Sequence, residues 1–464
     1  MLELVRGPVV RLAQWRPITM AVGELTADAD RAAGVMALAV STIGARLATL
    51  VASVLVAREL GVADFGAFGL LQAAIATFQV FAGFGLGETA TKYVAELREA
   101  APARAARIVR VSILSSLATG LACTLAVAAL APLVAARMAG DAADATLVRV
   151  AAPALWLGAV TSAQMGALTG LQAFGATAWL TLASGVLSGA LLVVGARVAG
   201  LYGAVAAIAG SAAVAWLFAE LTLRRHMRLA GLAGAPAEPV AREWRVLFDF
   251  SLPAVAGGLL VVPVHWWCAT VLARTPDGMR EVGLFNAANQ WYQALLFIPA
   301  LVGQVTLPAL ARRMGVGDRR AAVRSMWRAV RANAFLGLGV AAALGAGSPW
   351  IMAAYGDGFQ SGTATLVVAA ATGALVVAMS PVGHYIAATG RMWGGFAFNA
   401  AWAVTFVVGT SHLVRYGSLG LAGARLVAYV VLAVALVGFA LRLQGKVQDV
   451  PRAAFGAGEG AVTP

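Results

Sequence analysis

The sequence is poor in charged residues, in cysteine and in histidine. Charged residues make up only 12% of the 464, against about 25% in a soluble globular chain, and the mean hydropathy is +0.82. This composition excludes a soluble enzyme or a nucleic-acid-binding protein, although the net charge is +13. Cys123 and Cys268 lie inside apolar runs and are too few for a disulfide scaffold. With four scattered histidines they predict neither a metal centre nor a cofactor.

Long apolar runs dominate the rest of the chain. A bilayer core of about 30 Å requires roughly 20 apolar residues in each helix that crosses it. Twelve runs qualify, which predicts an all-α polytopic membrane protein with twelve transmembrane helices. The runs are residues 34–57, 65–86, 109–133, 147–171, 176–194, 201–223, 246–273, 282–309, 332–352, 362–387, 394–413 and 419–441.

The arginines and lysines set the predicted orientation, because segments that face the cytoplasm carry an excess of positive charge. With the N-terminus inside, 25 of the 34 Lys and Arg fall in inner segments and seven in outer ones, while Arg46 and Arg425 lie within spans. We therefore expect a multi-pass protein of the inner (cytoplasmic) membrane with both termini in the cytoplasm. The basic loops are interpreted as topological signals.

Short motifs recur in the same order at a spacing of 216 to 220 residues. The matched pairs are 54–58 with 271–274, 64–68 with 281–285, and 200–204 with 420–424. Because each unit holds six spans, both units start inside, which predicts two parallel six-helix repeats around a central cavity. The expected divisions are a cytoplasmic N-terminal segment 1–33, a lobe 34–223, a cytoplasmic linker 224–245, a lobe 246–441 and a cytoplasmic tail 442–464.

A polar stripe runs along the first predicted span. Its members share one helical face, and they are Thr42, Arg46, Thr49 and Ser53. Because a charge at mid-membrane depth costs about 2.5–3.5 kcal/mol, this face is expected to line a cavity and to bind substrate. The alternative is a packing role, in which Arg46 pairs with a carboxylate or with backbone carbonyls.

Amide side chains form a second polar face. In the eighth predicted span they lie at helical spacing, at Asn286, Asn289, Gln290 and Gln293. Gln72 and Gln79 repeat the pattern more weakly in the second span. These amides are candidate substrate-binding groups, and hydrogen bonding between helices is the equally weighted alternative.

Arg425 and His265 are the remaining candidates for substrate binding. Arg425 lies one turn into the twelfth predicted span, and its repeat counterpart near Val205 is apolar, so the helix does not require the charge. Snorkelling of Arg425 to the outer interface is the alternative. His265 stands beside Trp266 and Trp267, where a structural hydrogen bond is the alternative to proton transfer.

Carboxylates are scarce inside the predicted spans. Glu220 and Asp249 lie at the cytoplasmic ends of the sixth and seventh spans, where ion coupling and simple solvation are both open. We find no carboxylate at mid-depth in a span, so the sequence identifies no coupling ion. It also holds no Walker-A motif and no catalytic cluster, which predicts that the protein is not an enzyme.

The arrangement resembles the polysaccharide-transporter branch of the MOP flippase superfamily, and within it the Wzx-type oligosaccharide flippases. The segments that carry the resemblance are residues 57–68, 83–93, 170–174, 250–253, 283–291, 303–308 and 355–359. The resemblance implies export of a polyprenyl-diphosphate-linked oligosaccharide from the inner to the outer leaflet, by two lobes that rock about a cationic cavity. It assigns to Arg46 the role of gripping the diphosphate.

Other functions stay open at this point. A multidrug or organic-cation antiporter shares the architecture, but it would favour acidic groups in the cavity. A lipid II flippase usually has fourteen spans, and a non-transporting scaffold would not need the polar faces. The expected partners are the lipid-linked oligosaccharide, the bilayer and polysaccharide polymerase or assembly proteins, with no nucleic acid, and the expected state is a monomer.

Overall fold

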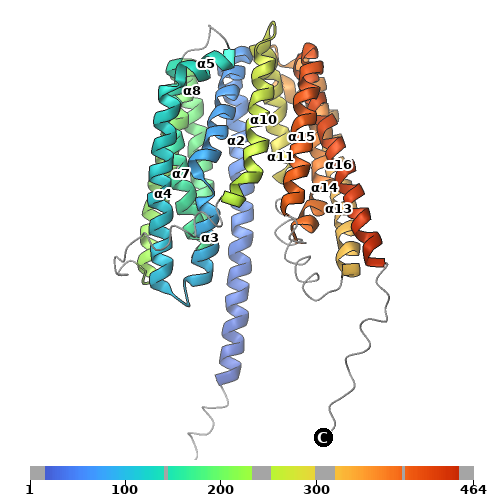
Figure 1. Cartoon of the computed structure of the whole chain (residues 1–464). Helices are drawn as coiled ribbons and strands as arrows, with labels where there is room; N and C mark the ends of the chain where they lie inside the picture. The colour runs from blue at the N-terminus through green and yellow to red at the C-terminus, as the bar shows by residue number, and fades with distance from the viewer. Residues whose placement is uncertain (1–15, 140–144, 233–251, 298–318, 389–391, 449–464) are drawn as a thin grey trace, which may run out of the picture.

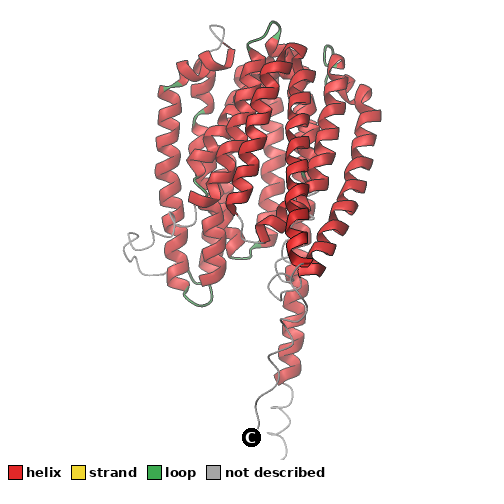
Figure 2. Cartoon of the chain, turned by 45° about the vertical axis from the view of Figure 1, so that its right-hand side comes forward, coloured by secondary structure: helices red, strands yellow, loops and turns green. Residues whose placement is uncertain are grey.

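A computed structural model describes residues 16–139, 145–232, 252–297, 319–388 and 392–448. Over these residues the secondary structure is helical, with turns between the helices and no strand (Figure 2). This confirms the all-α membrane fold class. Long runs of Ala, Leu and Val favour helix here, because in a bilayer every backbone polar group must be bonded within its own segment.

The helices before residue 230 begin with a long one. The bounds are α2 Arg16–Gly83, α3 Leu86–Leu97, α4 Pro102–Ala129, α5 Ala131–Ala139, α6 Ala145–Ala151, α7 Pro153–Gly170 and α8 Phe174–Leu229. The backbone of α2 breaks at Gly61, with φ of 74°, and that of α8 breaks at Gly200, with φ of 55°. Glycine permits this left-handed backbone, so each long helix doubles back as two antiparallel segments.

The helices after residue 251 are shorter. Their bounds are α10 Leu252–Ala273, α11 Gly278–Leu295, α13 Arg319–Ala354, α14 Thr363–Ala388, α15 Met392–Leu413 and α16 Gly417–Gln448. Within the described ranges, seven helical stretches are long and apolar enough to cross a membrane. Two of the predicted runs lie in α8, and α2 contains one run and most of a second, 65–86. The runs 246–273 and 282–309 extend beyond the described residues, so the count of twelve crossings stays a prediction.

Two groups of helices stand side by side (Figure 1). α2, α3, α4, α7 and α8 pack on one another, and α10, α11, α13, α14, α15 and α16 do the same. Small residues bring α2 and α8 together, since Ala45 lies against Gly185 and Ala52 against Gly189. The exact lobe, linker and tail boundaries predicted above stay predictions.

The two groups meet at the end of the bundle where α2 breaks, here called the Gly61 end. The opposite end, at the turn between α3 and α4, is called the Ala101 end. At the Gly61 end backbones touch, because a methyl group on Gly66 would overlap the Met279 carbonyl oxygen and one on Gly283 would overlap the Val62 carbonyl oxygen. These glycines allow α2 and α11 to approach more closely than any larger residue would.

Side chains complete the contact. The Arg58 Nε donates to the Ala354 carbonyl at 2.6 Å, and the Phe65 ring lies 6.2 Å from that of Tyr355 and 5.8 Å from that of Phe359. Phe65 is fully buried between the two groups. The groups are therefore closed against each other at the Gly61 end.

Candidate functional site

The polar stripe on α2 lies beside the face that packs on α8. The Thr42 hydroxyl donates to the Leu38 carbonyl at 2.7 Å, and the Thr49 hydroxyl donates to the Ala45 carbonyl at 2.8 Å. Both bonds return to the same helix, which leaves the hydroxyl oxygens able to accept. Ser53 Oγ is buried and has no hydrogen-bond partner among the described residues.

Arg46 is the exposed charge of this stripe. It lies fifteen residues before Gly61, which corresponds to about 22 Å along the helix axis and falls within a bilayer core. Its side chain is exposed, as is that of Thr49, and no described carboxylate forms an ion pair with it. The guanidinium is therefore available to an external anion.

The amides of the second predicted span differ from each other. Gln79 Nε2 donates to the Leu155 carbonyl at 3.4 Å, and its side chain lies against Gly158 of α7. Gln79 thus joins two helices of the same group, as the packing alternative anticipated. Gln72 is half-buried on the same segment.

The amides of α11 divide in three ways. Asn286 Nδ2 donates to the Phe65 carbonyl at 3.4 Å and lies against Gly69, so it belongs to the contact between the groups. Asn289 accepts a hydrogen bond from Arg425. Gln290 is half-buried and Gln293 is exposed, which leaves these two free to meet a ligand.

Arg425 is fully buried, with 0% of its surface exposed. Its Nη1 lies 2.7 Å from Asn289 Oδ1, and its Cζ lies 4.1 Å from the ring centre of Tyr292 and 4.9 Å from that of Phe285. Both rings meet the cation through their electron-rich faces. The snorkelling alternative is therefore wrong, because the charge points into the protein and not toward the interface.

Two nitrogens of this guanidinium, Nε and Nη2, are buried without a partner among the described residues. The Tyr292 hydroxyl donates to the Tyr429 hydroxyl at 3.2 Å, and the Tyr429 ring lies 5.4 Å from that of Trp402. A shell of aromatic rings from α11, α15 and α16 thus surrounds one positive charge. In this conformation a substrate could reach Arg425 only after these helices rearrange.

His265 belongs to the edge of the same shell. Its Nδ1 lies 2.9 Å from the Val261 carbonyl, and its ring lies 5.1 Å from that of Trp402 and 5.4 Å from that of Phe406. The backbone bond and the stacking favour the structural alternative over proton transfer.

Of the two predicted ion-coupling residues, Glu220 lies within the described ranges and Asp249 lies outside them. Glu220 Oε2 accepts from Gln164 Nε2 at 2.6 Å, and its other oxygen pairs with Arg224 one turn later. Both partners favour a structural role.

Sequence reasoning missed the aromatic shell. Phe285, Tyr292, Trp402 and Tyr429 look like ordinary apolar residues of a membrane helix. The signal that could have found Tyr292 is its spacing, because it follows Asn289 by three residues and so shares a face with it.

The described helices define a polytopic all-α membrane protein with one fully buried arginine, Arg425. Its fold is that of transporters of the MOP superfamily, as two solved structures show. The inward-facing conformation of a multidrug resistance MATE family transporter of that superfamily is similar, with a TM-score of 0.67 and 16% identity over 89% of this chain and 100% of that one. The lipid II flippase MurJ in an inward closed conformation is similar at a TM-score of 0.68 and 13% identity, over 89% of this chain and 88% of that one. Identities this low show the fold alone.

The chain belongs to the polysaccharide biosynthesis protein family, whose family model matches residues 32–314. A curated relative, the EPS I polysaccharide export inner membrane protein EpsE of Ralstonia nicotianae, is 30% identical over 405 residues, which cover 82% of this chain and 87% of that protein. The resemblance to the polysaccharide branch of the MOP superfamily is therefore confirmed.

Proposed function

We propose that this protein flips a polyprenyl-diphosphate-linked oligosaccharide from the inner to the outer leaflet of the cytoplasmic membrane by alternating access. The observation that carries the proposal is Arg46, an exposed guanidinium within an apolar helix that no described carboxylate neutralises. A diphosphate cannot cross hydrocarbon unaided, and a guanidinium offers it two parallel charge-assisted hydrogen bonds. The curated relative, a polysaccharide export protein of the inner membrane, supports the same substrate class and location.

The predicted orientation indicates which side of the membrane the closed Gly61 end faces. With both termini in the cytoplasm, the Gly61 end faces outward, and the contacts of Phe65 with Tyr355 and Phe359 close the outer side. The chain is then in an inward-facing state, ready to accept substrate from the inner leaflet. The two solved structures described above carry inward conformations as well.

Polar groups on α2 and α11 suit the sugar part of the substrate. Thr42 and Thr49 keep acceptor capacity on their hydroxyl oxygens, and Gln290 and Gln293 offer amides to sugar hydroxyls. The lipid tail would stay in the bilayer beside the two groups. Gln72, Ser53 and His265 stay secondary candidates for substrate binding. We expect the buried pair of Arg425 and Asn289 to hold α11 in position and not to contact the substrate in this conformation.

The test measures which leaflet holds the lipid-linked oligosaccharide. In cells that lack the protein, complete units should accumulate on the cytoplasmic side, and wild type should relieve this. We expect Arg46→Ala to insert normally and to lose tenfold or more of the flipping rate, because it removes a charge-assisted contact with the anion. Full transport by Arg46→Ala would overturn the role of Arg46.

Arg149→Ala is the matched control. Arg149 is also an exposed arginine, but it lies on α6 outside the polar stripe, so its loss should leave flipping unchanged. Labelling of Thr49→Cys from water in an otherwise cysteine-free chain should succeed in a transporter and fail in a scaffold. No accumulation of lipid-linked units, together with new sensitivity to cationic drugs, would favour the multidrug antiporter instead.

A further inference from the structure

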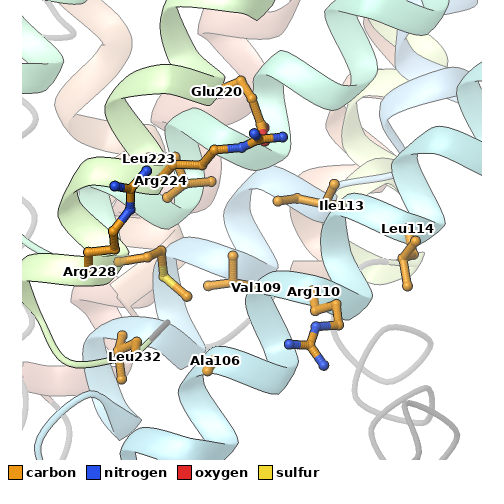
Figure 3. A pocket seen from close by; sticks show the side chains of 11 residues that line it. Ala106, Val109, Arg110, Ile113, Leu114, Glu220, Leu223, Arg224, Arg228 and Leu232 are labelled. Atoms are coloured by element: carbon orange, nitrogen blue, oxygen red, sulfur yellow. The ribbon is translucent and has the colours of Figure 1, made fainter. Parts of the chain in front are cut away.

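A hollow of about 330 Å³ lies between α4 and α8 (Figure 3), and no residue of the polar stripe on α2 lines it. Both helices pack on α7, and the residues that line the hollow come from the first turns of α4 and the last turns of α8. Val109 and Leu223 form its buried floor, and they pack in one apolar cluster with Leu168 of α7. The hollow is therefore a groove on the flank of the bundle, close to the Ala101 end.

Three arginines stand around this groove against a single carboxylate. Arg224 pairs with Glu220, and Figure 3 shows its side chain reaching toward that carboxylate. Arg110 on α4 and Arg228 on α8 are exposed, and neither forms an ion pair with another described residue. Two positive charges are thus left to an outside anion, one from each wall.

The surface next to the groove is apolar. Toward the middle of the bundle, exposed leucines follow one another on α4 at Leu114, Leu121 and Leu125. On α8, Leu221 is exposed and shares a helical face with Arg228. A ligand bound here would meet cations at the Ala101 end and an apolar surface that extends toward the middle of the bundle. A phospholipid matches this pattern, because it is charged at one end and carries two acyl chains at the other.

We propose that this groove binds an anionic diacyl phospholipid of the phosphatidylglycerol class. The side chains of Arg110 and Arg228 point apart in Figure 3, and both would turn toward the lipid phosphate at the mouth of the groove. The acyl chains would follow the leucines of α4. The position agrees with the charge-based orientation, in which the Ala101 end faces the cytoplasmic leaflet. Basic pockets on that side of membrane proteins are suited to anionic head groups, because each nearby Arg adds attraction to the phosphate.

The experiment counts lipids retained by the purified full-length protein in native mass spectrometry. Phosphatidylglycerol, phosphatidylethanolamine and a polyprenyl phosphate are offered separately. We expect preferential retention of phosphatidylglycerol and a loss of affinity on the order of tenfold in the double variant Arg110→Gln/Arg228→Gln. The matched control is Arg149→Gln/Arg225→Gln, which removes two exposed arginines that do not line the groove and should retain wild-type binding.

A second variant keeps every charge and fills the groove. Ile113→Trp should lower phosphatidylglycerol retention as well, since the indole would occupy the space of the glycerol region. Equal retention of phosphatidylethanolamine, or unchanged binding in both the Arg110→Gln/Arg228→Gln and Ile113→Trp proteins, would overturn the proposal. Preferential retention of the polyprenyl phosphate would overturn it too, and would make the groove a waiting position for substrate. Failure to retain any of the three lipids would also overturn the proposal.

Discussion

The guanidinium of Arg425 donates to Asn289 Oδ1 at 2.7 Å, and this neutral amide is its hydrogen-bonding partner within the described part of the chain. A fully buried positive charge is thus held by an amide oxygen and two aromatic faces, and not by an opposite charge. The arrangement links α16 to α11, so the two helices are expected to move as one unit.

Asn289→Leu should destabilise the protein by about 3 kcal/mol, because it leaves a buried charge without its acceptor. The measurement is the thermal unfolding midpoint of the purified protein, followed by tryptophan fluorescence. Gln293→Leu is the control, since Gln293 lies one turn later on the same helix and is exposed. Equal midpoints for the two variants would show that Arg425 does not depend on Asn289.

A carboxylate of α11 caps the start of α16. Glu281 Oε2 accepts from the Ser418 backbone N–H at 2.6 Å, and Gly417 has φ of 64° directly before it. A negative group at a helix N-terminus satisfies a free N–H and the helix dipole together. Glu281→Ala should therefore cost about 1–2 kcal/mol of stability in the same unfolding assay.

Glu59→Ala gives the comparison. Glu59 pairs with Arg197 at 2.7 Å, but the arginine side chain is 60% exposed, and pairs of this kind contribute about 0–1 kcal/mol. We expect a smaller loss than in Glu281→Ala and a dependence on salt. A larger loss in Glu59→Ala would mean that this surface pair contributes more to stability than the cap does.

Gly283→Ala should force the two groups apart at the Gly61 end, because the new methyl group would overlap the Val62 carbonyl oxygen. The readout is labelling of Phe65→Cys by a water-soluble maleimide in an otherwise cysteine-free chain. We expect slow labelling with glycine at 283, since Phe65 is fully buried, and faster labelling with alanine.

The control for that experiment is Gly339→Ala on α13, where an added methyl group would meet open space. It should leave the labelling of Phe65→Cys slow. Fast labelling in both variants would indicate that the helices separate without help from the substitution.

The sequence was sufficient for the fold class and for the family, because apolar length and the motifs of residues 283–291 are local properties. It also marked Arg425 as unusual, since the position near Val205 in the other repeat is apolar. What it could not supply was the surroundings of Arg425. They come from α11, α15 and α16, which are far apart in the chain, and no helical spacing relates them.

The basic residues show the same limit. Charge counting treats Arg110 and Arg228 as topological signals of two separate segments. The structure places them on opposite walls of one groove (Figure 3). Likewise Gln72 and Gln79 are equivalent by spacing, but Gln79 donates a hydrogen bond to a backbone carbonyl of α7. Spacing identifies a helical face, and only the packing decides what that face meets.

The closure at the Gly61 end contains no ion pair between the groups among the described residues. Its arginines, Arg58 and Arg274, donate to backbone carbonyls, and the rest is glycine, ring and backbone contact. Van der Waals contacts of this kind lose about a quarter to a half of their attraction when the surfaces separate by about 1 Å, whereas charges attract over a Debye length of about 8 Å. The contact between the two groups is therefore expected to be either fully formed or fully broken, and to depend less on ionic strength than an ion pair would. Any salt dependence of transport would then report on the anionic cargo and its arginine.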